Sequence, residues 1–328
     1  MCTAISMQNG DHYFGRNLDL EYSYNEQIVI TPRRFPFVFR KREKMTQHYA
    51  MIGMAFVQGD YPLYYEAVNE KGLGMAGLNF PGNGVYLACR PDRENVAPFE
   101  LIPRVLGECA GLEQAVRLLQ QINIVDLHFS PQLPNTPLHW LVADQSGSLV
   151  VEQTCDGLHL YRNPVGVLTN NPTFGWHMTN LCNYMGVGAA QPQNCFAPQL
   201  ELAPFSRGMG SLALPGGFSS QSRFVQAAFV LHNTLPEQEE RGRAARFFHI
   251  LSSVAMPRGC TKTQEGKDQY TRYSCCCNTT KGIYYYTTYE NSAITAVDLH
   301  REELETDRLI AYPMDTTPKI IHQNQKSG

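Results

Sequence analysis

Residues 1–19 read MCTAISMQNGDHYFGRNLD, and this stretch decides both the fold and the chemistry that we expect of the chain. Cys2 directly follows Met1, and removal of Met1, which is usual before a small residue, makes Cys2 the N-terminal residue. It then carries a thiol nucleophile and an α-amine, and an α-amine has an ordinary pKa of about 7.7–8.0. Near neutral pH such an amine can accept the thiol proton. Cys2 therefore combines a nucleophile and a general base in one residue.

Five further polar residues lie at the ends of expected strands or at the start of an expected helix: Arg16, Asp19, Asn79, Asn170 and Arg223. Asparagine side chains at strand ends can donate to a developing oxyanion, and a neighbouring cation such as Arg16 favours a thiolate. Asp19 could hold the α-amine. Each residue also fits an ordinary role, in a turn, a surface ion pair or a solvated helix. The sequence alone does not bring these distant segments together.

The hydrophobic pattern predicts short strands, two pairs of helices and one long irregular segment. Residues 186–221 are rich in Gly, Pro, Gln and Ser and are expected to form loops, and the aromatic-rich residues 61–65 are expected to form another. Residues 159–161 and 165–169 are expected to continue the sheet begun by 138–144 and 148–155. The other expected strands are 11–18, 27–31, 50–57, 72–79, 282–289, 293–298 and 309–312, and the expected helices are 99–106, 112–122, 222–232 and 241–254.

This order of elements favours an α+β fold in which stacked sheets carry helices on their outer faces. No Pro- or Ser-rich linker divides the chain, so residues 1–328 are expected to form a single domain. Residues 72–74 (GLG) lack the following Gly and helix of a dinucleotide site, so no nucleotide cofactor is expected.

Composition argues against several classes of function. A net charge of −3 gives no electrostatic reason to expect nucleic acid or an anionic membrane as a partner. No apolar run approaches the roughly 18 residues of a membrane span, and residues 1–14 lack the features of a secretory signal. We therefore expect a cytoplasmic protein.

The ten cysteines show no C-x-x-C pair, and the histidines show no H-x-x-x-H spacing. We therefore predict no metal site, and we expect most of the cysteines to be small buried apolar residues. The run Cys275–Cys277 leaves a redox role open as an alternative.

The chain resembles the choloylglycine hydrolase family of the N-terminal-nucleophile hydrolases, and within it the bile salt hydrolases. The resemblance spans nearly the whole chain in order. Its motifs are residues 1–3 (MCT), 14–19 (FGRNLD), 69–74 (NEKGLG), 76–81 (AGLNFP), 134–136 (PNT), 167–170 (VLTN), 172–174 (PTF), 222–224 (SRF) and 282–286 (GIYYY).

This resemblance implies a four-layer αββα sandwich of two antiparallel sheets and hydrolysis of a linear amide without a cofactor. It implies that Cys2 is the nucleophile and that its α-amine is the general base. Asn170, rather than Asn171, aligns with the Leu-Thr-Asn pattern of the family. The remaining roles that it implies are tuning of the thiolate by Arg16, orientation of the amine by Asp19, an oxyanion hole of Asn79 and Asn170, and support of the charged network by Arg223.

The family's two main branches cleave bile salts and penicillin V, and Asn79 matches the bile salt branch, where many penicillin V acylases carry Tyr. The expected substrates are therefore glycine- and taurine-conjugated bile acids, and the family suggests a homotetramer. The sterol body needs an apolar pocket, for which Leu18, Phe129 and Leu133 are candidate walls. Gly175 departs from the acidic residue of many relatives.

Three alternatives to bile salt hydrolysis remain at this point. Penicillin V or another N-acyl amide could be the principal substrate. The protein could also be a non-catalytic bile-acid-binding protein or a thiol-redox protein. The residues do not decide between a preference for glycine and one for taurine conjugates.

Overall fold

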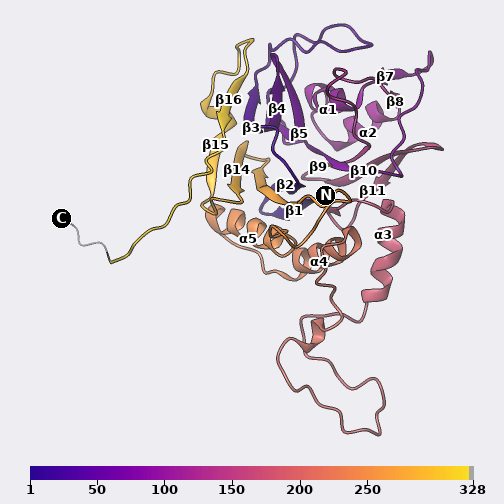
Figure 1. Ribbon diagram of the computed structural model, residues 1–328, viewed down its shortest axis with the longest axis vertical. Coiled ribbons are helices and arrows are strands. Elements are labelled where there is room, and N and C mark those ends of the chain that lie inside the picture. The colour runs from indigo at the N-terminus through magenta and orange to yellow at the C-terminus, as the bar shows by residue number, and fades with distance from the viewer. Residues whose placement is uncertain (325–328) are drawn as a thin grey trace.

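The computed structural model describes residues 1–324, and an antiparallel six-stranded sheet, here called sheet I, carries the N-terminus (Figure 1). Its central hairpin joins β1 (Cys2–Asn9) to β2 (Asp11–Leu20) through Gly10, whose φ of 71° is readily adopted only by glycine. The strand order in sheet I is β12 (Val167–Leu168), β1, β2, β13 (Tyr270–Asn278), β14 (Ile283–Thr288) and β15 (Thr295–Asp298).

Sheet II is antiparallel and eight-stranded, and it packs face to face on sheet I. Gly74 allows this close approach, because a Cβ at this position would lie 2.7 Å from the ring of Phe14 in sheet I. The strand order is β11 (Gly157–Arg162), β10 (Gly147–Thr154), β9 (Leu138–Asp144), β6 (Gly74–Asn79), β5 (Tyr61–Asn69), β4 (Met51–Gln58), β3 (Gln27–Thr31) and β16 (Ile310–Pro313). A short parallel pair, β7 (Glu94–Val96) and β8 (Ile122–Ile124), lies outside both sheets.

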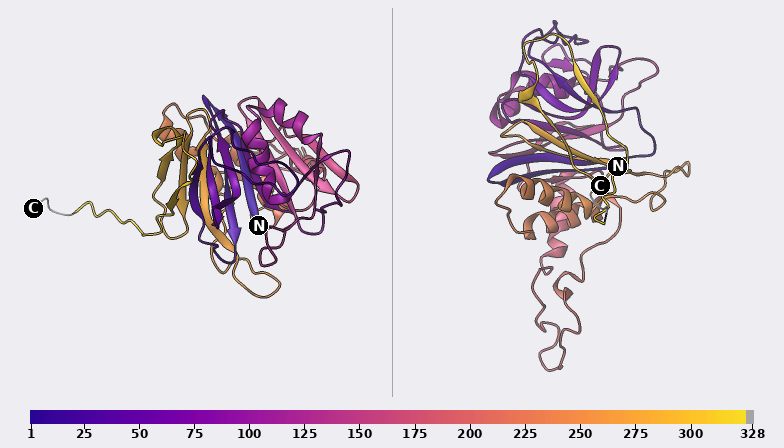
Figure 2. Two further views of the ribbon diagram at one scale, coloured as in Figure 1. Left: turned by 90° about the horizontal axis from the view of Figure 1, so that it is seen from above. Right: turned by 90° about the vertical axis from the view of Figure 1, so that its left-hand side faces the viewer.

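Helices cover the outer face of each sheet, which gives four layers (Figures 1 and 2). On sheet II lie α1 (Leu101–Glu108) and α2 (Leu112–Leu119), and on sheet I lie α4 (Ser220–Asn233) and α5 (Glu240–Ser252). One hydrophobic core fills the space between the sheets and beneath α4 and α5, and a second lies between sheet II and α1 and α2. The expected α+β fold with an αββα sandwich is confirmed.

Several predictions about single elements were wrong. Residues 61–65 form the first half of strand β5 and not a loop; Pro62 lies near the strand start, where proline is tolerated, so it does not interrupt the strand. Residues 167–168 pair with β1 in sheet I and do not continue the sheet of β9 and β10. The sequence pattern of a strand is the same in either sheet, so it could not show which of the two sheets residues 167–168 join. The prediction also missed strand β13 and helix α3 (Phe174–Leu181).

Residues 185–219, here called the projecting segment, extend away from the layered body before the chain enters α4 (Figures 1 and 2). The expected loops of residues 186–221 are confirmed except for one short 3₁₀ turn at Met209–Ser211 and the start of α4. Within residues 1–324, no helix has both the length and the apolar character needed to cross a bilayer.

Candidate active site

Strand β1 separates two environments at Cys2. Cys2 pairs directly with Leu18 on β2, so Cys2, Leu18 and Arg16 share one face of sheet I. Asp19 and Thr3 lie on the opposite face, toward the layer of α4 and α5. The thiol and the charged groups that support the backbone are therefore placed on opposite sides of the same short strand.

Asn170 holds the backbone nitrogen of Cys2. Its side-chain Oδ1 accepts a hydrogen bond from the Cys2 nitrogen at 2.9 Å, and its Nδ2 donates to the carbonyl oxygen of Asn79 at 2.7 Å. Its backbone is held as well, because its N–H donates to Ser220 Oγ at 2.8 Å and its carbonyl oxygen lies 3.0 Å from Nε2 of His177. Asn170 is thus fixed both at its backbone and at both ends of its side-chain amide.

Arg223 connects this amide to the strand. It lies in the first turn of α4, which begins where the side chain of Ser219 accepts from the nitrogen of Ser222. Its Nη1 donates to the carbonyl oxygen of Cys2 at 2.5 Å and to Thr3 Oγ1 at 2.6 Å, and its Nη2 donates to Asn170 Oδ1 at 2.7 Å. Burial lowers the pKa of Arg223, and the acidic groups of Asp19 and Cys2 oppose that shift.

Asp19 lies beside the chain end and is fully buried. Its backbone carbonyl accepts from the Met1 amine at 2.6 Å, and its Oδ1 accepts from Thr271 Oγ1 at 2.6 Å. Its Oδ2 lies 3.9 Å from Nη1 of Arg223 and accepts no hydrogen bond within the described chain. This carboxylate oxygen is therefore an available acceptor close to the N-terminus.

Arg16 lies on the thiol side of the strand. Its Nη1 donates to the carbonyl oxygens of Gly77 at 2.6 Å and Tyr65 at 3.1 Å, while its buried Nη2 has no partner in the part of the chain that the structure describes. Burial disfavours the charge, but the acidic groups of Cys2, Tyr273 and Glu66 outweigh it, and the pKa of Arg16 lies above its ordinary value. The guanidinium therefore remains positively charged at all relevant pH values.

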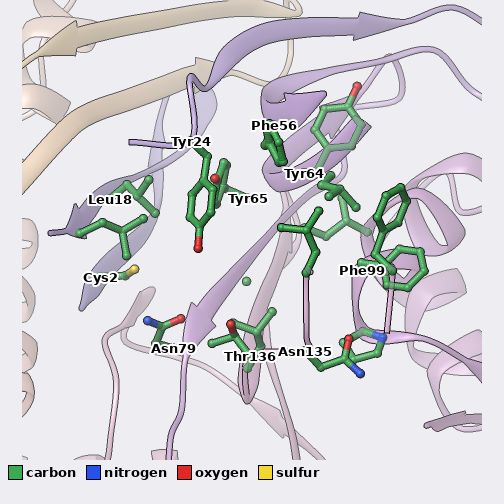
Figure 3. Close-up of a pocket in the computed structure, with 18 of the residues that line it drawn as sticks. Cys2, Leu18, Tyr24, Phe56, Tyr64, Tyr65, Asn79, Phe99, Asn135 and Thr136 are labelled. Atoms are coloured by element: carbon green, nitrogen blue, oxygen red, sulfur yellow. The ribbon is translucent and has the colours of Figure 1, made fainter. Parts of the chain in front are cut away.

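A cavity of about 400 Å³ opens from Cys2, and strand β2 of sheet I, strands of sheet II and the loops beside them line it (Figure 3). The side chains of Asn79 and Leu18 lie next to Cys2 at one end of this cavity. All three predicted walls, Leu18, Phe129 and Leu133, line it. Residues 63–65 of the aromatic-rich segment 61–65 line it as well, whereas Tyr24, Phe56, Phe99 and Ile102 are walls that were not predicted.

A family model described as linear amide C–N hydrolases, choloylglycine hydrolase family, matches residues 2–312. The chain belongs to the choloylglycine hydrolase family. The resemblance inferred from the sequence motifs is therefore confirmed.

Known proteins are similar to this chain in sequence or in structure. The chain is 51% identical over 314 residues to bile salt hydrolase/transferase of Lactiplantibacillus plantarum, across 96% of this chain and 97% of that protein. A crystal structure of a mutant conjugated bile acid hydrolase from Clostridium perfringens is 39% identical, with a TM-score of 0.91 over 99% of this chain and 100% of that one. Penicillin V acylase from Agrobacterium tumefaciens shares the fold, with a TM-score of 0.75 at 21% identity over 94% of this chain and 90% of that one.

The six residues predicted to be catalytic in this choloylglycine hydrolase lie around one point of the fold. Asp19, Asn170 and Arg223 surround the backbone of Cys2, whereas Arg16 and the side chain of Asn79 lie on the cavity side. The sequence analysis missed the residues that hold these groups, such as Thr3, Thr271, Ser220 and His177. A lone Thr, Ser or His carries no signal of such a role until the fold brings it to its partner.

The structure also bears on the redox alternative for Cys275–Cys277, on the departure at Gly175 and on the expectation of no metal site. The three cysteines lie within β13 and are buried, and burial raises the pKa of each thiol, which disfavours the thiolate that redox chemistry needs. Gly175 lies exposed in the first turn of α3, and a Cβ there would meet no atom within 4 Å. Within residues 1–324, no group of three or more His, Cys, Asp or Glu side chains is arranged to hold a metal ion.

Proposed function

We propose that this protein hydrolyses the amide bond of glycine- and taurine-conjugated bile acids. The observation that carries the proposal is the position of Cys2 at one end of a largely apolar cavity of about 400 Å³, with its nitrogen held by Asn170. Such a cavity suits a sterol body, and the amide at the end of its side chain would then meet the thiol. The names of the relatives from L. plantarum and C. perfringens support the same substrate class.

In the proposed reaction Met1 is removed first, so that the nitrogen held by Asn170 becomes the α-amine. The amine takes the thiol proton, and the sulfur of Cys2 attacks the amide carbonyl. The C–N bond then breaks, glycine or taurine leaves with a proton from the amine, and the acyl group remains on Cys2 as a thioester. Water, deprotonated by the same amine, hydrolyses the thioester and releases the bile acid.

The surrounding residues would act on different atoms of this reaction. Asn79, whose side chain faces the cavity, and the second N–H of the Asn170 amide would donate to the oxyanion. Arg16 would stabilise the thiolate, and the free carboxylate oxygen of Asp19 would accept from the α-amine. Arg223 would hold the Cys2 carbonyl and the Asn170 amide in fixed positions relative to each other.

The substrate class can be tested by measuring release of glycine from glycocholate and of taurine from taurocholate, with penicillin V assayed in parallel. We expect turnover of both bile salts. Turnover of penicillin V alone would contradict the proposal and move the protein to the other branch of the family.

The same assay tests the cavity walls: Leu133→Ala should raise KM for glycocholate about tenfold with kcat little changed, because it removes roughly 1.5–3 kcal/mol of apolar burial.

We further propose that the protein is a cytoplasmic homotetramer. The projecting segment supports the oligomer, because Phe196 and Phe205 in it are 87% and 86% exposed, and Met185 and Leu212 are also largely exposed. Apolar side chains gathered on an extended segment usually mark a contact with another chain.

Light scattering after size exclusion should give four times the monomer mass. Replacing Phe196 and Phe205 together with Ser should reduce that mass, and replacing the exposed Tyr289, which lies outside the segment, with Ser serves as the control. An unchanged mass in the Phe196/Phe205 variant would show that the segment does not hold the oligomer together.

A further inference from the structure

Glu66 is a fully buried acid between the two sheets, and no part of the proposed reaction uses it. It extends from β5 of sheet II toward sheet I, where the hydroxyl groups of Tyr284 and Tyr273 donate to its carboxylate at 2.6 Å and 2.8 Å. The sulfur of Cys275 lies 3.4 Å from the same group. Burying a carboxylate is costly, and three donors supplied by the opposite sheet offset part of that cost.

The fourth neighbour of Glu66 is Arg16, whose Nη1 lies 3.8 Å from its Oε2. A bulge in β5 helps to create this contact: Met54 and Ala55 on β4 are paired with Glu66 and Tyr64, which leaves Tyr65 without a partner on that strand. The pairing of β5 with β6 also stops at Glu66 and Ala76. The guanidinium therefore bridges the two strands through the carbonyl oxygens of Tyr65 and Gly77, with Glu66 at its side.

We propose that Glu66 is a positioning residue that sets how much positive charge Arg16 presents to the Cys2 thiolate. This inference rests on the proposed role of Cys2 as the nucleophile. When Glu66 is ionised, it holds Arg16 and cancels part of its field. When Glu66 is protonated, the full charge of Arg16 acts on the sulfur and favours the thiolate.

The neighbouring groups make Glu66 the member of this cluster that changes its charge. Burial raises the pKa of Glu66, although Arg16, Tyr284, Tyr273 and Cys275 oppose the shift. Burial also raises the pKa values of those two tyrosines and of that cysteine, so they remain protonated donors, and Arg16 remains charged. Glu66 therefore takes up its proton at a higher pH than an ordinary glutamate, and the thiolate is supported further into the acidic range.

The test compares Glu66→Gln, which imitates the protonated acid, with wild type by alkylation of Cys2 with iodoacetamide across a range of pH. Mass spectrometry of the N-terminal peptide separates Cys2 from the other cysteines. We expect the midpoint of the alkylation profile to fall by about one pH unit, which is the order of the pKa shift that one nearby charge causes. Glu240→Gln is the control, because Glu240 likewise accepts from a tyrosine but lies with Asn278 and Lys281 in a different cluster. Its midpoint should match wild type.

Hydrolysis gives a second readout. A thiolate that forms more readily is a weaker nucleophile, so kcat of Glu66→Gln at the pH optimum should fall about threefold while KM stays constant. Glu66→Asp, which keeps the charge, should restore a midpoint close to wild type. If Glu66→Gln does not fold, Tyr284→Phe carries the test, because loss of its hydroxyl favours protonated Glu66 and should lower the midpoint by a smaller amount.

The inference is overturned if the folded Glu66→Gln variant keeps the wild-type midpoint, or if Glu66→Asp shifts the midpoint as far as Glu66→Gln does. Lower activity with an unmoved midpoint would assign Glu66 a purely structural role. Because alkylation needs no substrate, a shifted midpoint in a protein that does not cleave bile salts would contradict only the proposed substrate.

Discussion

Cys2→Ala should lower the hydrolysis of conjugated bile acids by about 10⁴-fold or more while leaving the fold intact. The variant removes the sulfur, which is the only protein atom proposed to form a covalent bond with the substrate. Loss of a nucleophile removes most of the catalytic power of an acyl-transfer site. Cys2 is 2% exposed, and alanine keeps the β1 backbone with its bonds to Asn170 and Arg223. Release of glycine and taurine measures the rate of hydrolysis, and a thermal melt shows whether the fold is intact.

The controls for this variant separate the nucleophile from other thiols. Cys109→Ala removes another buried thiol, which lies beyond sheet II after α1, and should leave turnover unchanged. The intact mass of the active wild-type protein should lack one methionine. Activity in a protein that retains Met1 would contradict the α-amine mechanism, and activity in Cys2→Ala would contradict the assignment of the nucleophile.

Asn170→Ala should lower kcat/KM by about 10²–10³-fold, the usual effect of removing one oxyanion donor. It should also destabilise the protein by about 3 kcal/mol, because the Cys2 nitrogen and Nη2 of Arg223 each lose a buried partner. Steady-state kinetics and urea denaturation measure the two effects.

Asn171→Ala is the matched control, because the two asparagines are adjacent and chemically identical. Asn171 donates to the carbonyl of Pro81 and to Asn83 at 2.6 Å, near the surface, and neither of these hydrogen bonds involves Cys2 or Arg223. Its replacement should change kcat/KM less than about threefold. Equal losses in the two variants would mean that the loop as a whole, rather than the Asn170 amide, supports the reaction.

The sequence predicted the architecture well because hydrophobic periodicity and turn residues report local structure directly. It failed where the outcome depended on partners. Residues 167–168 have the pattern of a strand, but only pairing with β1 places them in sheet I. Residues 270–278 escaped prediction because strand β13, with polar and cysteine residues in its interior, lacks a clear alternation of apolar and polar side chains.

The same limit applies to the site. Cys2, Arg16 and Asp19 lie close together in the sequence, and their grouping follows from one hairpin. The partners of Cys2 lie far along the chain, and only the motifs of the family connected them to it. Glu66 was missed although a signal existed: it is the single acid within the otherwise apolar and aromatic segment 63–68, and such an acid needs partners from another element if the segment is buried.

The distance along the chain between these partners also determines when the site can form during folding. The bond from Cys2 to Asn170 spans 168 residues, and the bond from Arg223 to the Cys2 carbonyl spans 221. Contacts of such separation form slowly, because the chain loses much entropy before they are made. A ribosome must therefore deliver about two thirds of the polypeptide before the backbone of Cys2 gains the groups that hold it. Until α4 docks, the carbonyl group of Cys2 in the first strand of the nascent chain lacks the guanidinium that later holds it.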